Sequence, residues 1–456
     1  MRVVLFMPHT LSMDSTTPPM SLLMLAAVVE REHDVRIVFP IDFDAMMATL
    51  PASLADADVV GVSINSFNWY RARQTIGEIR RHFPQLRIVI GGPHPTHCDR
   101  HCLETSAADV AVRGEGEATF PDLLGAWAAG RDADGIKGLT WKDRDGAIHV
   151  NPERELISAA ELDALPLPAY HLVPPQRYGF VPMETSRGCR YRCVFCGIPT
   201  PRGIRQFSLA RVERNLRQLA ALRDRFVQDG IFLCDDSFSA HRERVVGTLE
   251  LLRTIMPDAM IGCEARISEL QRDDLFLQFA ANRVFLIQVG VECGYQAGLR
   301  RIKKGLTLDM IQDFAVAATR LPFRYQIYWS YMIGFPWETA SEVVQTINFA
   351  FDTARAAGSQ QPQLNVFSPY PGSDIAARPE RYGLSPPTPA LYDDPAWFSQ
   401  FLGYSRVAPA DRPALQTYLL GIHRSFPRHR ALSVLRLPTG AIVDLGGKSS
   451  VSWAAT

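Results

Sequence analysis

Three cysteines in the middle of the chain have the types and spacing needed to hold iron. Cys189, Cys193 and Cys196 are separated by three and then two residues, and they come directly after a predicted strand at 183–187. Three thiolates on one tight loop can bind three irons of a [4Fe–4S] cluster and leave the fourth iron open to a ligand. Zinc or a chance grouping is the alternative, but zinc usually takes a fourth protein ligand. The spacing therefore favours the iron–sulfur cluster.

A second group of possible metal ligands lies in the first third of the chain. Its members crowd into nine residues, with spacings of three and four that the start of a helix also produces. The group consists of His94, His97, Cys98, His101 and Cys102. We interpret it as one turn after another of a helix rather than as a zinc site.

The overall composition is that of an ordinary globular protein. Of the 456 residues, 47% are hydrophobic and 21% are charged, and 48 basic residues balance 48 acidic ones. A formal charge of zero provides no general attraction to nucleic acid or to an anionic membrane. The N-terminal apolar run is too short for a signal peptide, and no window approaches the ~18 apolar residues of a membrane span. We expect a cytoplasmic protein without a membrane span or nucleic-acid partner, whose cysteines stay reduced.

Alternating strand and helix patterns predict two α/β units. Over residues 1–150 the alternation ends in two extended runs around Asp145-Gly146, which predicts a doubly wound, Rossmann-like sheet closed by a hairpin. Residues 151–180 are rich in proline and predict a linker. Six further strand–helix units over 181–384 predict an open (β/α)6 barrel, and 385–456 predict a short, mostly helical C-terminal segment. Ligands of parallel sheets bind at the carboxyl ends of the strands.

The cysteine loop and the segments behind it resemble the radical S-adenosylmethionine (SAM) superfamily over roughly residues 180–375. The resemblance implies that SAM binds the open iron and is cleaved to methionine and a 5′-deoxyadenosyl radical by one electron, from a donor such as flavodoxin or ferredoxin. It also implies SAM contacts by an aromatic residue before the third cysteine, by polar residues after the second and fourth strands, and by a glycine after the fifth. The matching residues are Phe195, Asp235, Asp236, Glu292 and Gly334.

The first unit resembles the cobalamin-binding domain of the cobalamin (B12)-dependent subclass, through the segments Pro18–Leu23, Gly91–Thr96 and Arg113–Glu117. The motif D-x-H-x-x-G is absent, and His9 lacks both of its flanking residues. The resemblance therefore implies that cobalamin is bound without an axial histidine, with Asn65 and Trp69 over its lower face. The full set of implied contacts is Ser63, Asn65, Trp69, Gly91, Gly92, His94, Gly114 and Glu115. A fold that has lost its cofactor is the alternative.

Together these resemblances imply a methyltransferase that acts on an unactivated carbon of a small molecule, as in natural-product or secondary-metabolite biosynthesis. One SAM would methylate cobalamin, and a second would supply the radical that abstracts a substrate hydrogen. Cyclisation, ring contraction or rearrangement without net methyl transfer is the alternative within the subclass. A non-catalytic sensor is an alternative of another class, but no basic recognition helix is evident. RNA modification is disfavoured because no basic module follows the barrel.

Overall fold

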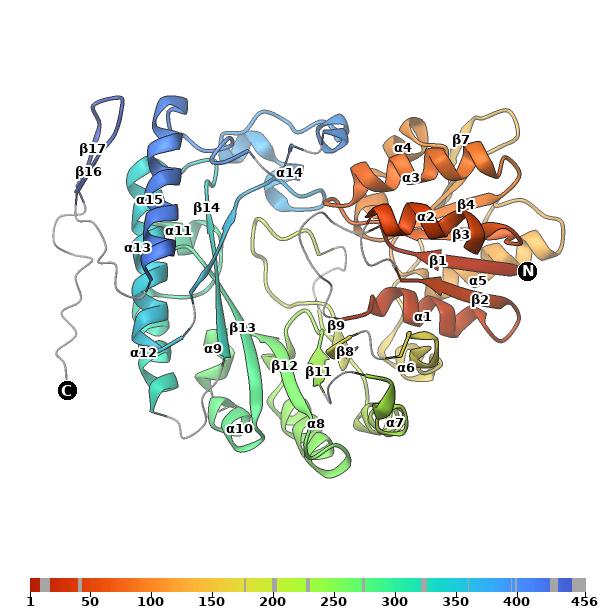
Figure 1. Ribbon diagram of the computed structural model, residues 1–456, viewed down its shortest axis with the longest axis horizontal. Coiled ribbons are helices and arrows are strands. Elements are labelled where there is room, and N and C mark those ends of the chain that lie inside the picture. The colour runs from red at the N-terminus through yellow and green to blue at the C-terminus, as the bar shows by residue number, and fades with distance from the viewer. Residues whose placement is uncertain are drawn as a thin grey trace.

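The chain forms two α/β units that lie side by side, the first at the right of Figure 1 and the second at the left. The computed structural model describes residues 1–8, 17–39, 43–175, 178–198, 203–226, 230–272, 275–320, 326–359, 361–394, 396–397, 400–426 and 434–444. His9 lies outside the described residues. The division into a doubly wound unit, an open barrel and a C-terminal segment agrees with the fold class that the sequence predicts.

The first unit is built on a seven-stranded sheet with the order β2-β1-β3-β4-β5-β6-β7. Strands β1 to β5 pair in parallel, and β6 and β7 add an antiparallel hairpin, as predicted. The strands are β1 Arg2–Phe6, β2 Asp34–Val38, β3 Val59–Ser63, β4 Arg87–Gly91, β5 Val110–Val112, β6 Leu139–Lys142 and β7 Ile148–Val150. The helices are α1 Met20–Val29, α2 Phe43–Leu54, α3 Trp69–His82, α4 Pro93–Thr105 and α5 Gly116–Ala128. Helices on both faces bury the central strands, which explains their nearly continuous apolar runs.

The second unit is built on six parallel strands in the order β15-β14-β13-β12-β11-β8. The strands are β8 Phe180–Met183, β11 Gly230–Leu233, β12 Met260–Ala265, β13 Val284–Glu292, β14 Gln326–Ile333 and β15 Gln363–Val366, and a short ribbon pairs β9 Ser186–Arg187 with β10 Arg205–Gln206. The helices are α6 Ala159–Ala164 before the sheet, then α7 Leu209–Ala221, α8 Arg242–Ile255, α9 Ile267–Leu270, α10 Leu275–Ala281, α11 Gln296–Arg301, α12 Leu308–Thr319, α13 Ala340–Ala356 and α14 Asp374–Ala377. Helices α7, α8, α10, α12 and α13 lie along the outside of the curved sheet (Figure 1).

The alternation of burial along the barrel strands separates their two faces. In β14, Ile327, Trp329 and Tyr331 are buried, whereas Tyr328 and Ser330 between them are not. Successive side chains of a strand point to opposite faces. The buried set therefore packs against the outer helices, and the intervening residues face the inside of the open barrel.

The C-terminal segment returns to both units. Helix α15 (Arg412–Ser425) corresponds to the helix predicted near 409–425, and it packs against α13. A hairpin of β16 (Val434–Arg436) and β17 (Ile442–Asp444) follows, and this hairpin was not predicted. A turn at Pro389–Asp393 reaches back to α3 and α4 of the first unit. The segment therefore closes over the junction between the units.

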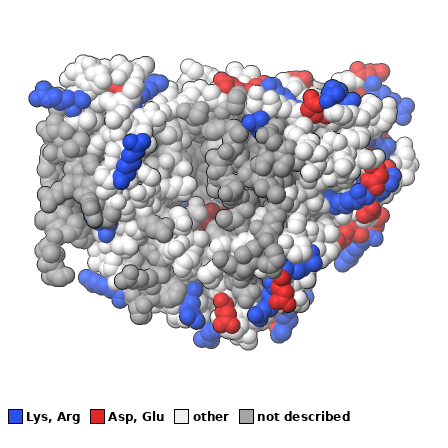
Figure 2. Space-filling model, in the orientation of Figure 1, with Lys and Arg blue, Asp and Glu red and all other residues white. Residues whose placement is uncertain are grey.

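Charged side chains of both signs are intermixed around the rim of the face seen in Figure 2, as the balanced composition leads one to expect. No helix in the part of the chain that the structure describes is long and apolar enough to cross a membrane.

Candidate cofactor-binding site

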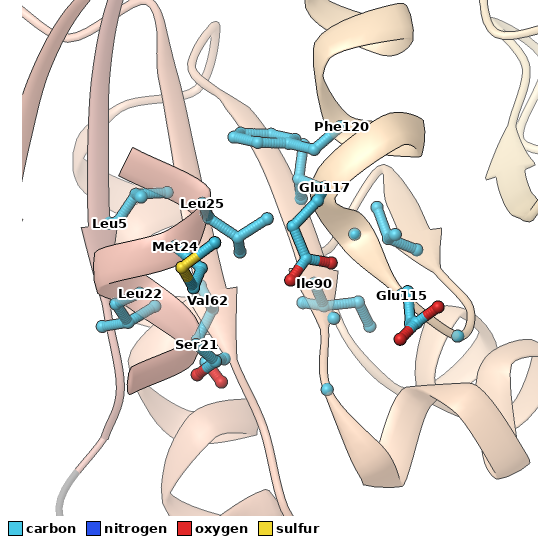
Figure 3. A pocket seen from close by; sticks show the side chains of 18 of the residues that line it. Leu5, Ser21, Leu22, Met24, Leu25, Val62, Ile90, Glu115, Glu117 and Phe120 are labelled. Atoms are coloured by element: carbon cyan, nitrogen blue, oxygen red, sulfur yellow. The ribbon is translucent and has the colours of Figure 1, made fainter. Parts of the chain in front are cut away.

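The carboxyl ends of the first sheet open onto a cavity of about 300 Å³. Its wall is largely apolar, and side chains from α1 on one side and α5 on the other converge on it (Figure 3). The apolar lining includes Leu22, Met24, Val62, Ile90 and Phe120. The second unit completes the lining with Glu184, Arg187, Ile198 and Asp236. One cavity therefore touches strand ends of both sheets.

Five of the eight residues predicted to contact cobalamin line this cavity: Ser63, Gly91, Gly92, Gly114 and Glu115. Gly92 has φ +101°, and a Cβ there would lie 2.6 Å from the carbonyl oxygen of Ile64, so the backbone requires glycine at this position. These small residues leave backbone accessible at the strand ends. Together with the apolar wall they fit a large ligand such as cobalamin, which Gly91, Gly92 and Gly114 would approach through their backbone.

The other three predicted contacts, Asn65, Trp69 and His94, do not line the cavity. The Asn65 carboxamide oxygen accepts from the amide of Asn68 at 3.0 Å, and Trp69 and His94 are 0% exposed. The two rings stack with centroids 5.2 Å apart, and the Trp69 indole donates to Asp393 of the C-terminal segment at 2.8 Å. Trp69 and His94 are enclosed by this packing, whereas Asn65 is half-buried, and contact of the three residues with cobalamin stays a prediction.

Burial also explains the chemistry of His94. Its Nδ1 lies 3.0 Å from the Ser66 hydroxyl, and the ring of Tyr392 meets it edge-on at 5.4 Å. Burial lowers the pKa of His94 to about 3, so the imidazole is neutral at physiological pH. No local pattern in the sequence indicates that His94 is buried here, since Tyr392 is almost 300 residues away along the chain.

The three predicted cluster ligands lie on the loop between β9 and β10. Backbone hydrogen bonds hold the middle of this loop, where the Val194 amide donates to Ile302 at 3.2 Å and the Val194 carbonyl accepts from Ile375 at 3.0 Å. Cys189, Cys193 and Cys196 are half-buried, and burial raises the pKa of the Cys196 thiol to about 11. The loop is thus fixed at its centre by residues of the barrel.

The chemistry of this donor set fits an iron–sulfur cluster. Among the described residues, no three His, Cys, Asp or Glu side chains converge closely enough to hold a single metal ion. A [4Fe–4S] cluster makes no such demand, because each thiolate binds a different iron. A positive charge stands beside the loop, with Arg266 Nη1 3.8 Å from the Cys193 sulfur.

The two acids predicted to contact SAM after β11 have different roles. Asp235 is 1% exposed and accepts from Thr185, Ser186 and Arg244, with the Arg244 guanidinium at 2.7 Å. Its carboxylate is held by donors within the protein, and its contact with SAM stays a prediction. Asp236 lines the cavity, accepts from the Gly188 amide at 2.7 Å and remains a candidate.

Two further SAM candidates lie close to one lysine. Glu292 has φ +75° and accepts from Lys304 Nζ at 2.9 Å, and both side chains are buried. The same Lys304 Nζ lies 5.8 Å from the ring centre of Phe195. The Phe195 ring packs against the Phe335 ring, with the two ring centres 5.9 Å apart. Phe195 and Glu292 are thus brought together beside the cluster loop.

Gly334 is buried, and its amide donates to Glu338 Oε2 at 2.6 Å. Its φ is +90°, and a Cβ would lie 3.1 Å from Leu402 of the C-terminal segment. The amide is therefore not free to contact SAM. Burial raises the pKa of Glu338 to about 8, so at neutral pH this side chain is mostly protonated.

The sequence interpretation missed two charged residues at the end of β12. Glu264 faces the inside of the barrel, because Cys263 and Ala265 on either side are buried against the helices. Surrounding protein raises the pKa of Glu264 to about 7. Arg266 stacks on the Tyr191 ring at 3.5 Å. The alternation around Glu264 was the available signal.

Comparison with known proteins agrees with this geometry. The family model described as the B12 binding domain matches residues 10–124, and that of the radical SAM superfamily matches residues 183–350. An uncharacterized methyltransferase of Pyrococcus horikoshii is 30% identical over 389 residues, which is 82% of each chain. The chain belongs to the cobalamin-dependent radical SAM enzymes. Its cofactors are a [4Fe–4S] cluster, SAM and cobalamin.

More distant relatives of this radical SAM enzyme include the cytidylyl-2-hydroxyethylphosphonate methyltransferase of Streptomyces wedmorensis. It is 25% identical over 346 residues, which is 68% of this chain and 64% of the relative. Among solved structures, the radical SAM methyltransferase TsrM from Kitasatospora setae, with cobalamin and a [4Fe–4S] cluster bound, has a TM-score of 0.66 at 19% identity and matches 83% of this chain and 75% of TsrM. That likeness shows a shared fold.

Proposed function

We propose that this enzyme methylates an unactivated carbon of a small molecule in natural-product or secondary metabolism. The observation that carries the proposal is the cavity bordered by strand ends of both sheets, with Arg187 in its lining two residues before Cys189. When bound, SAM at the cluster supplies a radical that removes a substrate hydrogen, and cobalamin supplies the methyl group. The chain's own contribution is to place both cofactors at the same cavity.

The relatives support transfer of a methyl group over other uses of these cofactors. The Pyrococcus horikoshii and Streptomyces wedmorensis proteins are both named methyltransferases. So is the 2-(S-pantetheinyl)-carbapenam-3-carboxylate methyltransferase of Streptantibioticus cattleyicolor, which is 27% identical over 223 residues. Two of these names denote small-molecule substrates, which supports a small molecule rather than a nucleic acid.

We assign the parts as follows. Residues 1–150 bind cobalamin, 151–180 link the units, 181–384 bind the cluster and SAM, and 385–456 cover the substrate. The cluster ligands are Cys189, Cys193 and Cys196, and the SAM contacts are Phe195, Asp236 and Glu292. The electron comes from a flavodoxin or ferredoxin in the cytoplasm, where thiols stay reduced.

The test begins with anaerobic purification in the presence of iron, sulfide and hydroxocobalamin. We expect about four irons and one cobalt per chain. The protein is then given SAM, methyl viologen-mediated reduction and a panel of small metabolites, and methylated product, 5′-deoxyadenosine and S-adenosylhomocysteine are measured together. Equal amounts of all three support the proposal. Iron without cobalt would overturn it.

Cyclisation without net methyl transfer is the second candidate. The anaerobic magnesium-protoporphyrin IX monomethyl ester cyclase of Cereibacter sphaeroides is 23% identical over 333 residues, which favours this alternative over the other rearrangements. A product formed with 5′-deoxyadenosine but without S-adenosylhomocysteine would establish it in place of methylation.

A further inference from the structure

A two-stranded ribbon closes the loop that carries the cluster cysteines. Strands β9 and β10 pair antiparallel, with Arg187 directly opposite Arg205. The residues between them include all three cluster cysteines. The two arginines therefore stand side by side at the base of the cluster loop.

Both arginines form ion pairs with the first unit. Arg205 donates to both carboxylate oxygens of Glu115, with Nη1–Oε2 at 2.8 Å and Nη2–Oε1 at 2.9 Å. Arg187 pairs with Glu115 at 3.3 Å, with Glu117 at 2.7 Å and with Glu184 of its own unit at 3.0 Å. We call these five residues the ion-pair clamp.

The ion-pair clamp is shielded from water. The two arginine side chains are 12% and 17% exposed, and the three carboxylates are 8% to 19% exposed. Glu115 also accepts from the Ile157 amide at 2.9 Å, so both of its oxygens are occupied. Shielded pairs with satisfied oxygens resist rearrangement, because separating them leaves a charge without a partner.

The clamp also borders the cavity. Glu115 is the residue before α5 and Glu117 is in its first turn, and both line the cavity together with Glu184 and Arg187. Figure 3 shows Glu115 and Glu117 on the α5 side of the cavity, opposite the side chains of α1. The base of the cluster loop is thus bonded to the wall of the cavity that fits cobalamin.

We propose that the ion-pair clamp sets the position of the cluster loop against the cobalamin cavity before either cofactor binds. Arg187 and Arg205 are positioning residues, which act through the ribbon and α5 rather than on the reacting atoms. This role goes beyond the proposed methylation, because any reaction that uses both cofactors requires them at a defined separation.

The first test is amide hydrogen exchange on the full chain without added cofactors. In Arg187→Met, the amides at the start of α5 should exchange about tenfold faster or more, because their tie to the ribbon is lost. Glu117→Gln changes no residue of the loop, but it removes a partner of Arg187. In this variant the amides of the ribbon should exchange about tenfold faster or more. Arg217→Met is the matched control, since Arg217 pairs with Glu213 at an exposed position on α7.

The second readout uses the reconstituted enzyme with SAM, titanium(III) citrate and no substrate. Arg187→Met should retain the iron and cobalt of the unmodified protein but release S-adenosylhomocysteine about tenfold more slowly. Arg187→Lys, which keeps one charge, should recover part of the rate. This readout needs no substrate but does require methyl transfer from SAM, so for an enzyme that forms no S-adenosylhomocysteine the hydrogen-exchange test decides the proposal alone.

Two results would overturn the proposal. One is unchanged exchange at α5 in Arg187→Met together with an unchanged ribbon in Glu117→Gln. The other is faster exchange throughout the chain in both variants, which would assign the clamp to general stability. If Arg187→Met does not fold, the ribbon response in Glu117→Gln decides between these outcomes.

Discussion

The two sheets present their cofactor edges in opposite ways. At the first sheet the edge is an apolar cavity shaped by small residues, among them Gly92 and Gly114. At the second sheet the edge is crowded with charged side chains, many of them already paired within the protein. Asp235 with Arg244 at 2.7 Å, and Glu292 with Lys304 at 2.9 Å, are examples.

This difference shows that the type of a residue at a strand end indicates its function more reliably for glycine than for a charged residue. A glycine at a strand end leaves space that persists without a ligand. A carboxylate in a shielded position needs a partner as soon as the chain folds, because an unpaired charge is costly to bury. Charged residues at strand ends can therefore serve the fold, as Asp235 does through its pair with Arg244.

The largest expected effect concerns the thiols at the second edge. In Cys196→Ala, the bound iron should fall from about four per chain to a small fraction, because two thiolates cannot retain a [4Fe–4S] cluster securely. Cys263→Ala is the control, since Cys263 is buried on the outer face of β12. Iron counts and 5′-deoxyadenosine formation after anaerobic reconstitution measure the effect. If Cys196→Ala bound as much iron as the protein without the substitution, the loop would not be the site of the cluster.

The paired aspartates test whether the charged edge serves the fold or the ligand. Asp235→Asn should lower the free energy of unfolding by about 3–5 kcal/mol, because Arg244 is left buried without its partner. Asp236→Asn should cost about 1 kcal/mol or less, and should weaken SAM binding instead. Urea unfolding and SAM titration separate the two. Equal losses of stability would contradict the division.

The glycines test the first edge. Gly92→Ala should cost about 2–3 kcal/mol, because its Cβ would lie 2.6 Å from the Ile64 carbonyl oxygen at a φ of +101°. Gly114→Ala has open space around it at a φ of +74° and should cost about 1 kcal/mol. Urea unfolding and hydroxocobalamin titration provide the measurements. Similar costs at both positions would mean that the close approach at Gly92 relaxes easily.

A further expected effect is a pH dependence at the second edge. Burial raises the pKa of Glu338 to about 8, so the folded state holds a proton that the unfolded state releases above its ordinary pKa near 4.5. The resulting stabilisation is complete below pH 4.5 and is lost as pH rises to about 8, at no more than about 1.4 kcal/mol per pH unit. Glu338→Gln should lack this slope. Unfolding free energies of both proteins between pH 5 and 9 test it, and parallel curves would contradict the raised pKa.

Much of the architecture could be predicted from the sequence, because periodicity and turn residues are local signals. Both parallel sheets, the hairpin after β5 and helix α15 follow from runs of neighbouring residues. The spacing of Cys189, Cys193 and Cys196 likewise places three thiols on one loop whatever surrounds it. The glycines at 91 and 92 lie on the cavity because a turn after a strand is a local event.

What only the tertiary structure decided is which polar side chains pair with each other. Trp69 donates a hydrogen bond to Asp393, and Glu115 forms ion pairs with Arg187 and Arg205 of the other unit. No short-range pattern encodes these contacts, since each depends on how two distant segments pack. The amino-acid sequence by itself determined that the chain has two sheets and a loop with three cysteines. The packing of those parts decided which of their polar residues remain free for a cofactor, because burial forces charged groups to find partners.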